Sequence, residues 1–158
     1  MNEQKLETVT SISLSGGFWQ TFKFVKIKRM TALKWLDLGN TPITDAELGY
    51  LKNLTNLEVL NLSNTQITDE GLPFLNNLTN LKELDLEGTR ISDAGLKHIK
   101  NLTNLKELIL DDNNITDKGL QYLKGLKNLE YLDLFNTKVT EDAVDALCSS
   151  LPKTRIEF

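Results

Sequence analysis

The sequence has little of what catalytic and metal sites are made from. Its 158 residues include one Cys and one His. A single Cys excludes an internal disulfide, and one Cys with one His leaves almost nothing for a zinc site or a nucleophile–base pair. No phosphate-binding glycine loop or nucleophile elbow is present. We therefore expect a protein that is not an enzyme and that holds no metal and no cofactor.

Long apolar runs are also missing. None approaches the roughly 20 residues of a membrane-spanning helix, which excludes an integral membrane protein. The segment MNEQKLETVTSISLS at the start has neither the basic residues nor the apolar stretch of a secretory signal peptide. The formal net charge is −4. We expect a soluble, cytoplasmic protein without membrane contact, with an exported effector or a part of a longer protein as the alternative.

Leucine, in contrast, is abundant, and it recurs at a fixed interval. It occupies 30 of the 158 positions, whereas aromatic residues make up 7% of the chain. Segments 33–56, 57–80, 81–104 and 105–128 align without gaps, and a fifth copy starts at Leu129 and slips by one residue at Leu151. The pattern predicts a single domain over residues 1–158. It consists of a degenerate cap repeat over 9–32, with Trp19 in an apolar column, five repeats of about 24 residues over 33–152, and a closing strand over 153–158 in which Ile156 and Phe158 face inward.

Each repeat combines two apolar periodicities. Leu84 and Leu86 are spaced as in a strand with one buried face, and Leu96, Ile99 and Leu102 are spaced as in a short helix or 3₁₀ turn. A strand followed by a helix in every repeat returns each strand parallel to the one before it. The sequence therefore predicts an α/β solenoid, with a curved parallel sheet on the concave side and short helices on the convex side.

Polar residues between strand and helix recur as strictly as the leucines. One column is expected to supply hydrogen bonds to backbone groups buried in the turn: Thr41, Thr65, Thr89, Asn113 and Thr137. A second column has the residue types of helix N-caps, each followed by an acid: Thr44, Thr68, Ser92, Thr116 and Thr140. Both columns are interpreted as parts of the scaffold.

The combined pattern L-x-x-L-x-L-x-x-(T/N)-x-(I/V)-(T/S)-(D/E) resembles the leucine-rich repeat family. The following Gly-Leu pairs at 71–72, 95–96 and 119–120 are similar to those of bacterial 24-residue repeats and of F-box-type adaptors. The Leu-Thr-Asn-Leu joins at 78–81 and 102–105 resemble those of internalin-like bacterial proteins. The resemblance implies a leucine-rich-repeat solenoid, coiled as a right-handed superhelix, that binds other proteins through its concave face.

Strand residues that point away from the leucines are the candidates for that face. Acids crowd its centre, and Arg155 is the only base in the four outward-facing columns. The central acids are Glu83, Asp85, Glu87, Glu107, Asp111 and Asp112, and Asp37 and Asp133 extend their columns. Large apolar residues flank them: Trp35 and Val59 on one side, and Ile109, Tyr131 and Phe135 on the other. Since Lys52, Lys97, Lys100, Lys118 and Lys124 lie on the predicted helices, charge is segregated between the two faces.

This distribution predicts a non-catalytic protein-interaction module whose partner presents a basic segment with apolar anchors. Tyr131, Phe135 and Ile109 would form the nearer anchor pocket, and Trp35 with Val59 a second one. Two alternatives involve no binding. The sheet face could be acidic only for solubility, and Trp35 could pack under residues 16–23. Calcium-binding spacings are missing, and an acidic face would repel nucleic acid.

Two other functions remain open from the sequence. The chain could be the substrate-recognition subunit or effector domain of a larger assembly, such as a ubiquitin-ligase complex. It could also be a structural protein that self-associates through its exposed edge strands. We expect a monomer.

Overall fold

Parallel strands define the molecule, one from each repeat. The computed structural model describes residues 3–15 and 24–158, and in this part the strands are β1 (Ser11–Ser13), β2 (Trp35–Asp37), β3 (Val59–Asn61), β4 (Glu83–Asp85), β5 (Glu107–Ile109), β6 (Tyr131–Asp133) and β7 (Arg155–Glu157). They form one seven-stranded sheet in sequence order, and every pairing is in register with the repeat. The sheet is open, so the fold is an α/β solenoid as the sequence predicts.

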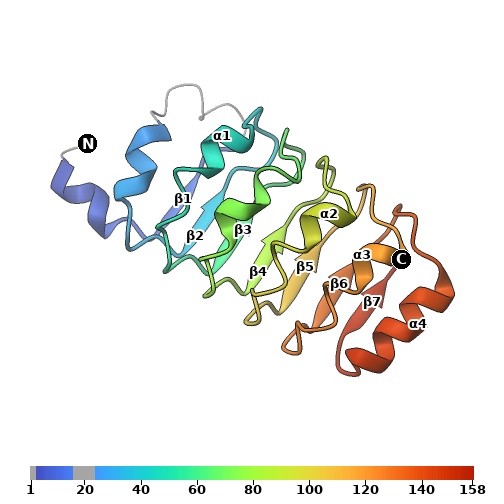
Figure 1. The fold of residues 1–158 in the computed structure, drawn as a ribbon. Coiled ribbons are helices and arrows are strands. Elements are labelled where there is room, and N and C mark those ends of the chain that lie inside the picture. Colours follow the sequence, from blue (N-terminus) through green and yellow to red (C-terminus); the bar gives the residue numbers. More distant parts are fainter. Residues whose placement is uncertain (1–2, 16–23) are drawn as a thin grey trace.

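Short helices cover the other side of the leucine core. They are η1 (Glu3–Thr8), η3 (Phe24–Arg29), α1 (Asp45–Leu48), η4 (Leu72–Leu75), α2 (Asp93–Leu96), α3 (Asp117–Leu120) and α4 (Glu141–Ser150). Figure 1 shows them together on one face of the sheet. No helix in the described part has the length and apolar character needed to cross a membrane. The opposite face of the sheet is left open to solvent.

The repeated apolar columns form one continuous core. In the third repeat Leu84, Leu86, Leu96 and Leu102 are at most 1% exposed, and the slipped Leu151 is 2% exposed. Each fully buried leucine contributes about 1.5–3 kcal/mol relative to an exposed one. The inward orientation expected for Phe158 is wrong, because 53% of this residue is exposed beyond the end of the last strand at Glu157.

The segment 9–32, for which the sequence predicts a degenerate cap repeat, departs from the others in its residue types. Ile27 and Met30 are fully buried in its apolar columns, whereas Val9 and Ile12 are only partly buried. The expectation for Trp19 lies outside the described residues. The division into a cap over 9–32, five repeats over 33–152 and a closing strand over 153–158 remains a prediction.

The buried Thr and Asn column does satisfy the turns. Thr65 Oγ1 donates to the carbonyl of Leu62 at 2.7 Å, and the other threonines of the column make the same bond within their own turns. Asn113 acts across two turns: its Nδ2 donates to the Leu86 carbonyl at 2.7 Å, and its Oδ1 accepts the Ile91 N–H at 3.0 Å. Buried backbone groups are thereby paired without water.

Four of the five expected N-cap residues stand directly before an α-helix with extended backbones: Thr44, Ser92, Thr116 and Thr140. Thr68 Oγ1 accepts the Glu70 N–H at 3.2 Å, as Ser92 and Thr116 accept theirs, but its repeat has a 3₁₀ turn that begins only at Leu72. Pro73 at the start of that turn lacks an N–H and fixes its own φ, which shifts and tightens the helical segment.

The acid after each cap residue serves the next repeat, a role its sequence position did not reveal. Ser92 N–H donates to Asp69 Oδ1 at 2.8 Å, and Ser92 Oγ donates to Asp69 Oδ2 at 2.5 Å. The same two-bond contact joins Asp45 to Thr68, Asp93 to Thr116 and Asp117 to Thr140. We call this series the aspartate ladder. It fixes one turn against the next along the helix side of the solenoid.

The aspartate ladder explains the glycine that precedes the helical leucine. A Cβ atom on Gly95 would lie 2.3 Å from Asp69 Oδ1, and Cβ atoms on Gly71 and Gly119 would lie 2.4 and 2.5 Å from the corresponding oxygens. No heavy atom can stand at that distance from a carboxylate held by two hydrogen bonds. Glycine is therefore required here by the neighbouring carboxylate.

We predict that Gly95→Ala lowers the free energy of unfolding by about 2 kcal/mol, because the added methyl group breaks the Asp69–Ser92 contact. Gly125→Ala is the matched control, since its Cβ atom would meet nothing within 4 Å. Urea denaturation measures both. Asp69→Ala combined with Gly95→Ala should cost less than the two single changes together. Equal stability of the Gly95 and Gly125 variants would contradict the ladder.

Candidate protein-interaction face

The strand register produces two rows of side chains on the concave face, which is the solvent-facing surface of the sheet. From β1 to β7 the first row is Ser11, Trp35, Val59, Glu83, Glu107, Tyr131 and Arg155. The second row is Ser13, Asp37, Asn61, Asp85, Ile109, Asp133 and Glu157. Neighbours in a row are one strand spacing apart, about 4.8 Å. Side chains far apart in the sequence thus form one surface.

A hollow of about 170 Å³ lies at the centre of this face. The side chains around it that face solvent are Trp35, Val59, Asn61, Glu83, Asp85, Glu107 and Ile109. The hollow brings Ile109 together with Trp35 and Val59, whereas the sequence grouped Ile109 with Tyr131 and Phe135. We call this feature the central hollow. It combines apolar walls with three carboxyl groups.

The carboxyl groups of the central hollow lack cationic partners. Among the described residues, no Lys, Arg or His forms an ion pair with Glu83, Asp85 or Glu107. Burial raises the pKa of Asp85, and the Glu87 N–H opposes this by hydrogen bonding. Burial and the charges of Glu83 and Asp85 raise the pKa of Glu107. The described residues therefore leave the negative charge here uncompensated.

Part of the second row has a structural duty. Asp37, Asn61, Asp85 and Asp133 each accept a hydrogen bond from the backbone N–H two residues on, at 2.8–3.0 Å. Such a bond closes the turn that follows the strand. Ile109 stands in the same column and has no oxygen to offer. One oxygen of the Asp111 carboxyl group is buried and has no hydrogen-bond partner.

Tyr131 is engaged by its neighbours in the last two strands. Its hydroxyl donates to Glu157 Oε2 at 2.8 Å and lies 3.1 Å from Asp133 Oδ2. The Arg155 guanidinium lies 5.8 Å from the ring centroid and pairs with Glu157. The hydrogen bond to Glu157 and burial raise the pKa of Tyr131 above its usual range. These contacts hold its ring in place on the C-terminal part of the face.

Phe135 lies in the turn after β6 and is 64% exposed, the largest fraction for any large hydrophobic residue that the structure describes. Within the described chain it makes no ring contact with Tyr131. Its carbonyl accepts the N–H of Asp112 at 3.1 Å. The structure thus places Phe135 beside Asp112 and outside the central hollow.

The outer acids gather beside that turn. Glu87, Asp111 and Asp112 place carboxylate oxygens within 4.8 Å of one another, and in the described residues they are the one group of three that could hold a metal ion. Asp112 also has a turn role, since its φ of 55° continues a left-handed column of Asn40, Asn64, Gly88 and Asn136.

A second surface feature escaped the sequence analysis. A groove of about 550 Å³ runs along the residues that precede the strands, lined by Lys34, Asn56, Glu58, Asn80, Lys82, Asn104, Lys106, Asn128 and Glu130. Each of these asparagines donates to the carbonyl of a Thr in the preceding repeat at 2.8 Å. Lys34 and Lys82 flank Glu58 and, chiefly through hydrogen bonds, lower its pKa to about 2. Two columns that repeat every 24 residues in the sequence could have revealed this groove: the charged residues Lys34, Glu58, Lys82, Lys106 and Glu130, and the asparagines Asn56, Asn80, Asn104 and Asn128.

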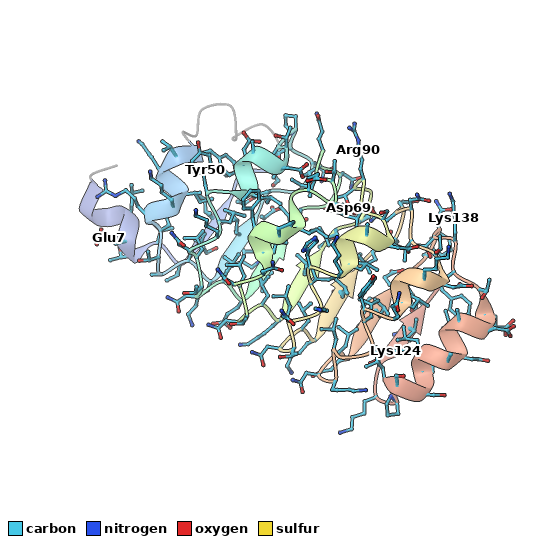
Figure 2. All side chains as sticks on the ribbon, in the orientation of Figure 1. Glu7, Tyr50, Asp69, Arg90, Lys124 and Lys138 are labelled. Carbon is cyan, nitrogen blue, oxygen red and sulfur yellow. The ribbon has the colours of Figure 1, made fainter. Side chains whose placement is uncertain are left out.

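Basic side chains also lie on the other side of the concave face, in the turns that follow the strands. Arg90 and Lys138 extend from the turns that follow β4 and β6, as Figure 2 shows. They line a shallow groove together with Ser92, Asp112 and Asn136. Lys138 Nζ donates to Asn114 Oδ1 at 2.7 Å. Basic side chains therefore border the concave face at its edges and leave its centre acidic.

Burial and the charges of Glu87 and Asp133 raise the pKa of Asp111 to about 6. An acid with a raised pKa in the folded state destabilises the fold above its ordinary pKa, and the loss is complete above about pH 7. Asp111→Asn should therefore raise the free energy of unfolding at pH 7.5 by about 1 kcal/mol, a value reduced for solvent screening. At pH 4 the two proteins should be equally stable. Equal stability at both pH values in urea titrations would contradict the repulsion inferred here.

Comparisons with known proteins agree with this architecture. The leucine-rich repeat region family matches residues 14–156. Internalin C2 from Listeria monocytogenes has a similar structure, with 32% identity, a TM-score of 0.67, and a match that covers 84% of this chain and 55% of the internalin. The chain thus spans about half the length of that protein. No curated protein sequence matches. Because the family match covers most of the repeats described above, the chain belongs to the leucine-rich repeat family.

Proposed function

We propose that the chain is a non-catalytic module that binds a basic segment of another protein on its concave face. The observation that carries the proposal is the uncompensated charge of Glu83, Asp85 and Glu107 beside exposed apolar side chains. Leucine-rich repeat proteins bind protein partners, which supports the general role. The basic character of the partner follows from charge complementarity alone.

The energetics favour an interaction role over mere solubility. Like charges directly opposite each other on adjacent strands destabilise a sheet, and Glu83 faces Glu107 in this way. Acidic residues spread over the whole surface would be enough for solubility, and they would not need to be concentrated around a hollow. A cationic partner would relieve the repulsion on binding, so part of the folded state's strain becomes binding free energy.

Exposed apolar residues supply the other half of the surface. Trp35 is 38% exposed and Phe135 64%, at opposite ends of the acidic centre. Aromatic side chains that become buried in a complex are frequent hot spots, because they give a large contact area at small entropic cost. We propose that the partner segment spans from Trp35 past the central acids toward Phe135. Two copies of the protein would repel each other through their acidic faces, which supports a monomer.

The proposal is tested by peptide selection, since the partner is unidentified. A displayed library of random 12-residue peptides is selected on the wild-type protein, and the selected peptides should carry net positive charge with apolar residues. Glu83→Lys combined with Glu107→Lys should weaken their binding by about 100-fold, and binding to the wild type should weaken as salt is raised.

The matched control is Glu141→Lys with Asp142→Lys, which makes the same charge change on exposed acids of α4. This variant should bind the selected peptides as the wild type does. Selected peptides that are neutral or acidic, or that bind both charge-reversed variants equally, would overturn the proposal. Urea denaturation of both variants shows whether they are folded when tested.

A further inference from the structure

The central hollow has a more specific shape than a generally acidic face requires. Its first row runs Trp35, Val59, Glu83, Glu107 over four adjacent strands, and its second row adds Asp85 and Ile109. The apolar side chains therefore lie on β2, β3 and β5, and the three carboxyl groups lie on β4 and β5. Its volume of about 170 Å³ is smaller than the roughly 300–1,000 Å³ of a pocket for a drug-sized ligand, so the occupant is a small group.

Its charges and its walls point to one kind of occupant. Glu83 and Glu107 are exposed and directly opposite each other, and the lysines that precede them in the chain turn to the groove at the sheet edge. There Lys82 pairs with Glu58 and Lys106 with Glu130. The two glutamates thus meet solvent without a cation from the described residues, in the hollow that Trp35 also lines.

A second observation comes from Ile109. Four residues of its column accept the N–H that closes the following turn, and Ile109 gives up this bond. A position that breaks a stabilising local pattern is expected where function requires it. What Ile109 provides instead is an apolar wall of the central hollow.

We propose that the central hollow is an arginine subsite, which receives the side chain of one arginine of the partner protein. The guanidinium lies between Glu83 and Glu107, and the aliphatic part of the side chain packs against Val59 and Ile109 with the ring of Trp35 beside it. This inference rests on the proposed function, because it names the residue that the basic segment inserts.

Arginine fits the site better than lysine does. Its planar guanidinium has five N–H donors and can bond two carboxylates that are fixed on adjacent strands. It is also more weakly hydrated than an ammonium group, so its transfer into a partly apolar hollow is less costly. A lysine ammonium group can also donate to both carboxylates, but it lacks the fixed planar fork of the guanidinium and is more strongly hydrated.

The test uses three capped pentapeptides that differ only in the central residue: Gly-Gly-X-Gly-Gly with X as arginine, citrulline or lysine. Citrulline keeps the shape of arginine and lacks its charge. Binding is followed by ¹H–¹⁵N spectra through the indole N–H of Trp35, which is assigned with Trp35→Phe. The arginine peptide should bind about tenfold more tightly than citrulline and severalfold more tightly than lysine.

Three variants locate the contact. Glu83→Gln with Glu107→Gln should weaken arginine binding by about tenfold. Ile109→Asn should weaken it as well while leaving the protein at least as stable in urea, since the asparagine can restore the turn bond. Glu141→Gln with Asp142→Asn, the matched control on α4, should leave the affinity unchanged.

Equal binding of the arginine and citrulline peptides, equal binding of arginine and lysine, or signal changes confined to the Tyr131–Phe135 end would overturn the arginine subsite. These results are separable from the fate of the proposed function. If they occur while selected peptides still lose affinity on charge reversal, only the subsite is wrong. If the arginine peptide binds as expected but selected peptides ignore the charge reversal, the proposed function is wrong, and the hollow binds arginine without being the place where a partner segment docks.

Discussion

A strand of three residues cannot bury its own leucines, and the whole molecule depends on this constraint. Leu84 is covered only because the strands on either side present Leu60 and Leu108 in register. The aspartate ladder and the buried Thr and Asn column then hold each turn at the height that this register demands. Stability is therefore a property of neighbouring repeats, and the terminal ones are covered on one side only.

The same constraint leaves the other side of each strand free to carry a function. Nothing in the core depends on whether residue 83 is a glutamate or residue 35 a tryptophan, since both side chains point to solvent. Some outward positions are still claimed by the scaffold: Asp85 closes a turn, and Asp112 holds a left-handed backbone. The positions without such a duty, Glu83, Glu107 and Trp35 among them, are those on which recognition can be built.

The sequence predicted those features of the fold that recur with the 24-residue period. The strand register, the buried leucines and the role of Thr65 and Asn113 all repeat every 24 residues, so one repeat explains the others. Contacts that depend on a side-chain direction were out of reach. The reach of Asp69 to the next repeat, the reason for Gly95, and the capture of Tyr131 by Glu157 are examples.

Single departures from the repeat were also missed, because a pattern says nothing about its exceptions. Pro73 shifts the start of one helical turn to Leu72, and Phe158 is exposed beyond the end of β7. Ile109 was recognised as apolar and exposed, yet its place in the same hollow as Trp35 depends on how far side chains lean across three strands. The candidate residues could thus be named from the sequence, but their grouping into one site could not.

The most direct test of a concave, acidic binding face is photo-crosslinking of a selected basic peptide to the protein. A benzoylphenylalanine placed at Val59 lies on that face, and one placed at Lys97 lies on the helix side. We predict that Val59→benzoylphenylalanine captures the peptide and that Lys97→benzoylphenylalanine does not. Efficient capture from position 97 together with none from position 59 would contradict this prediction.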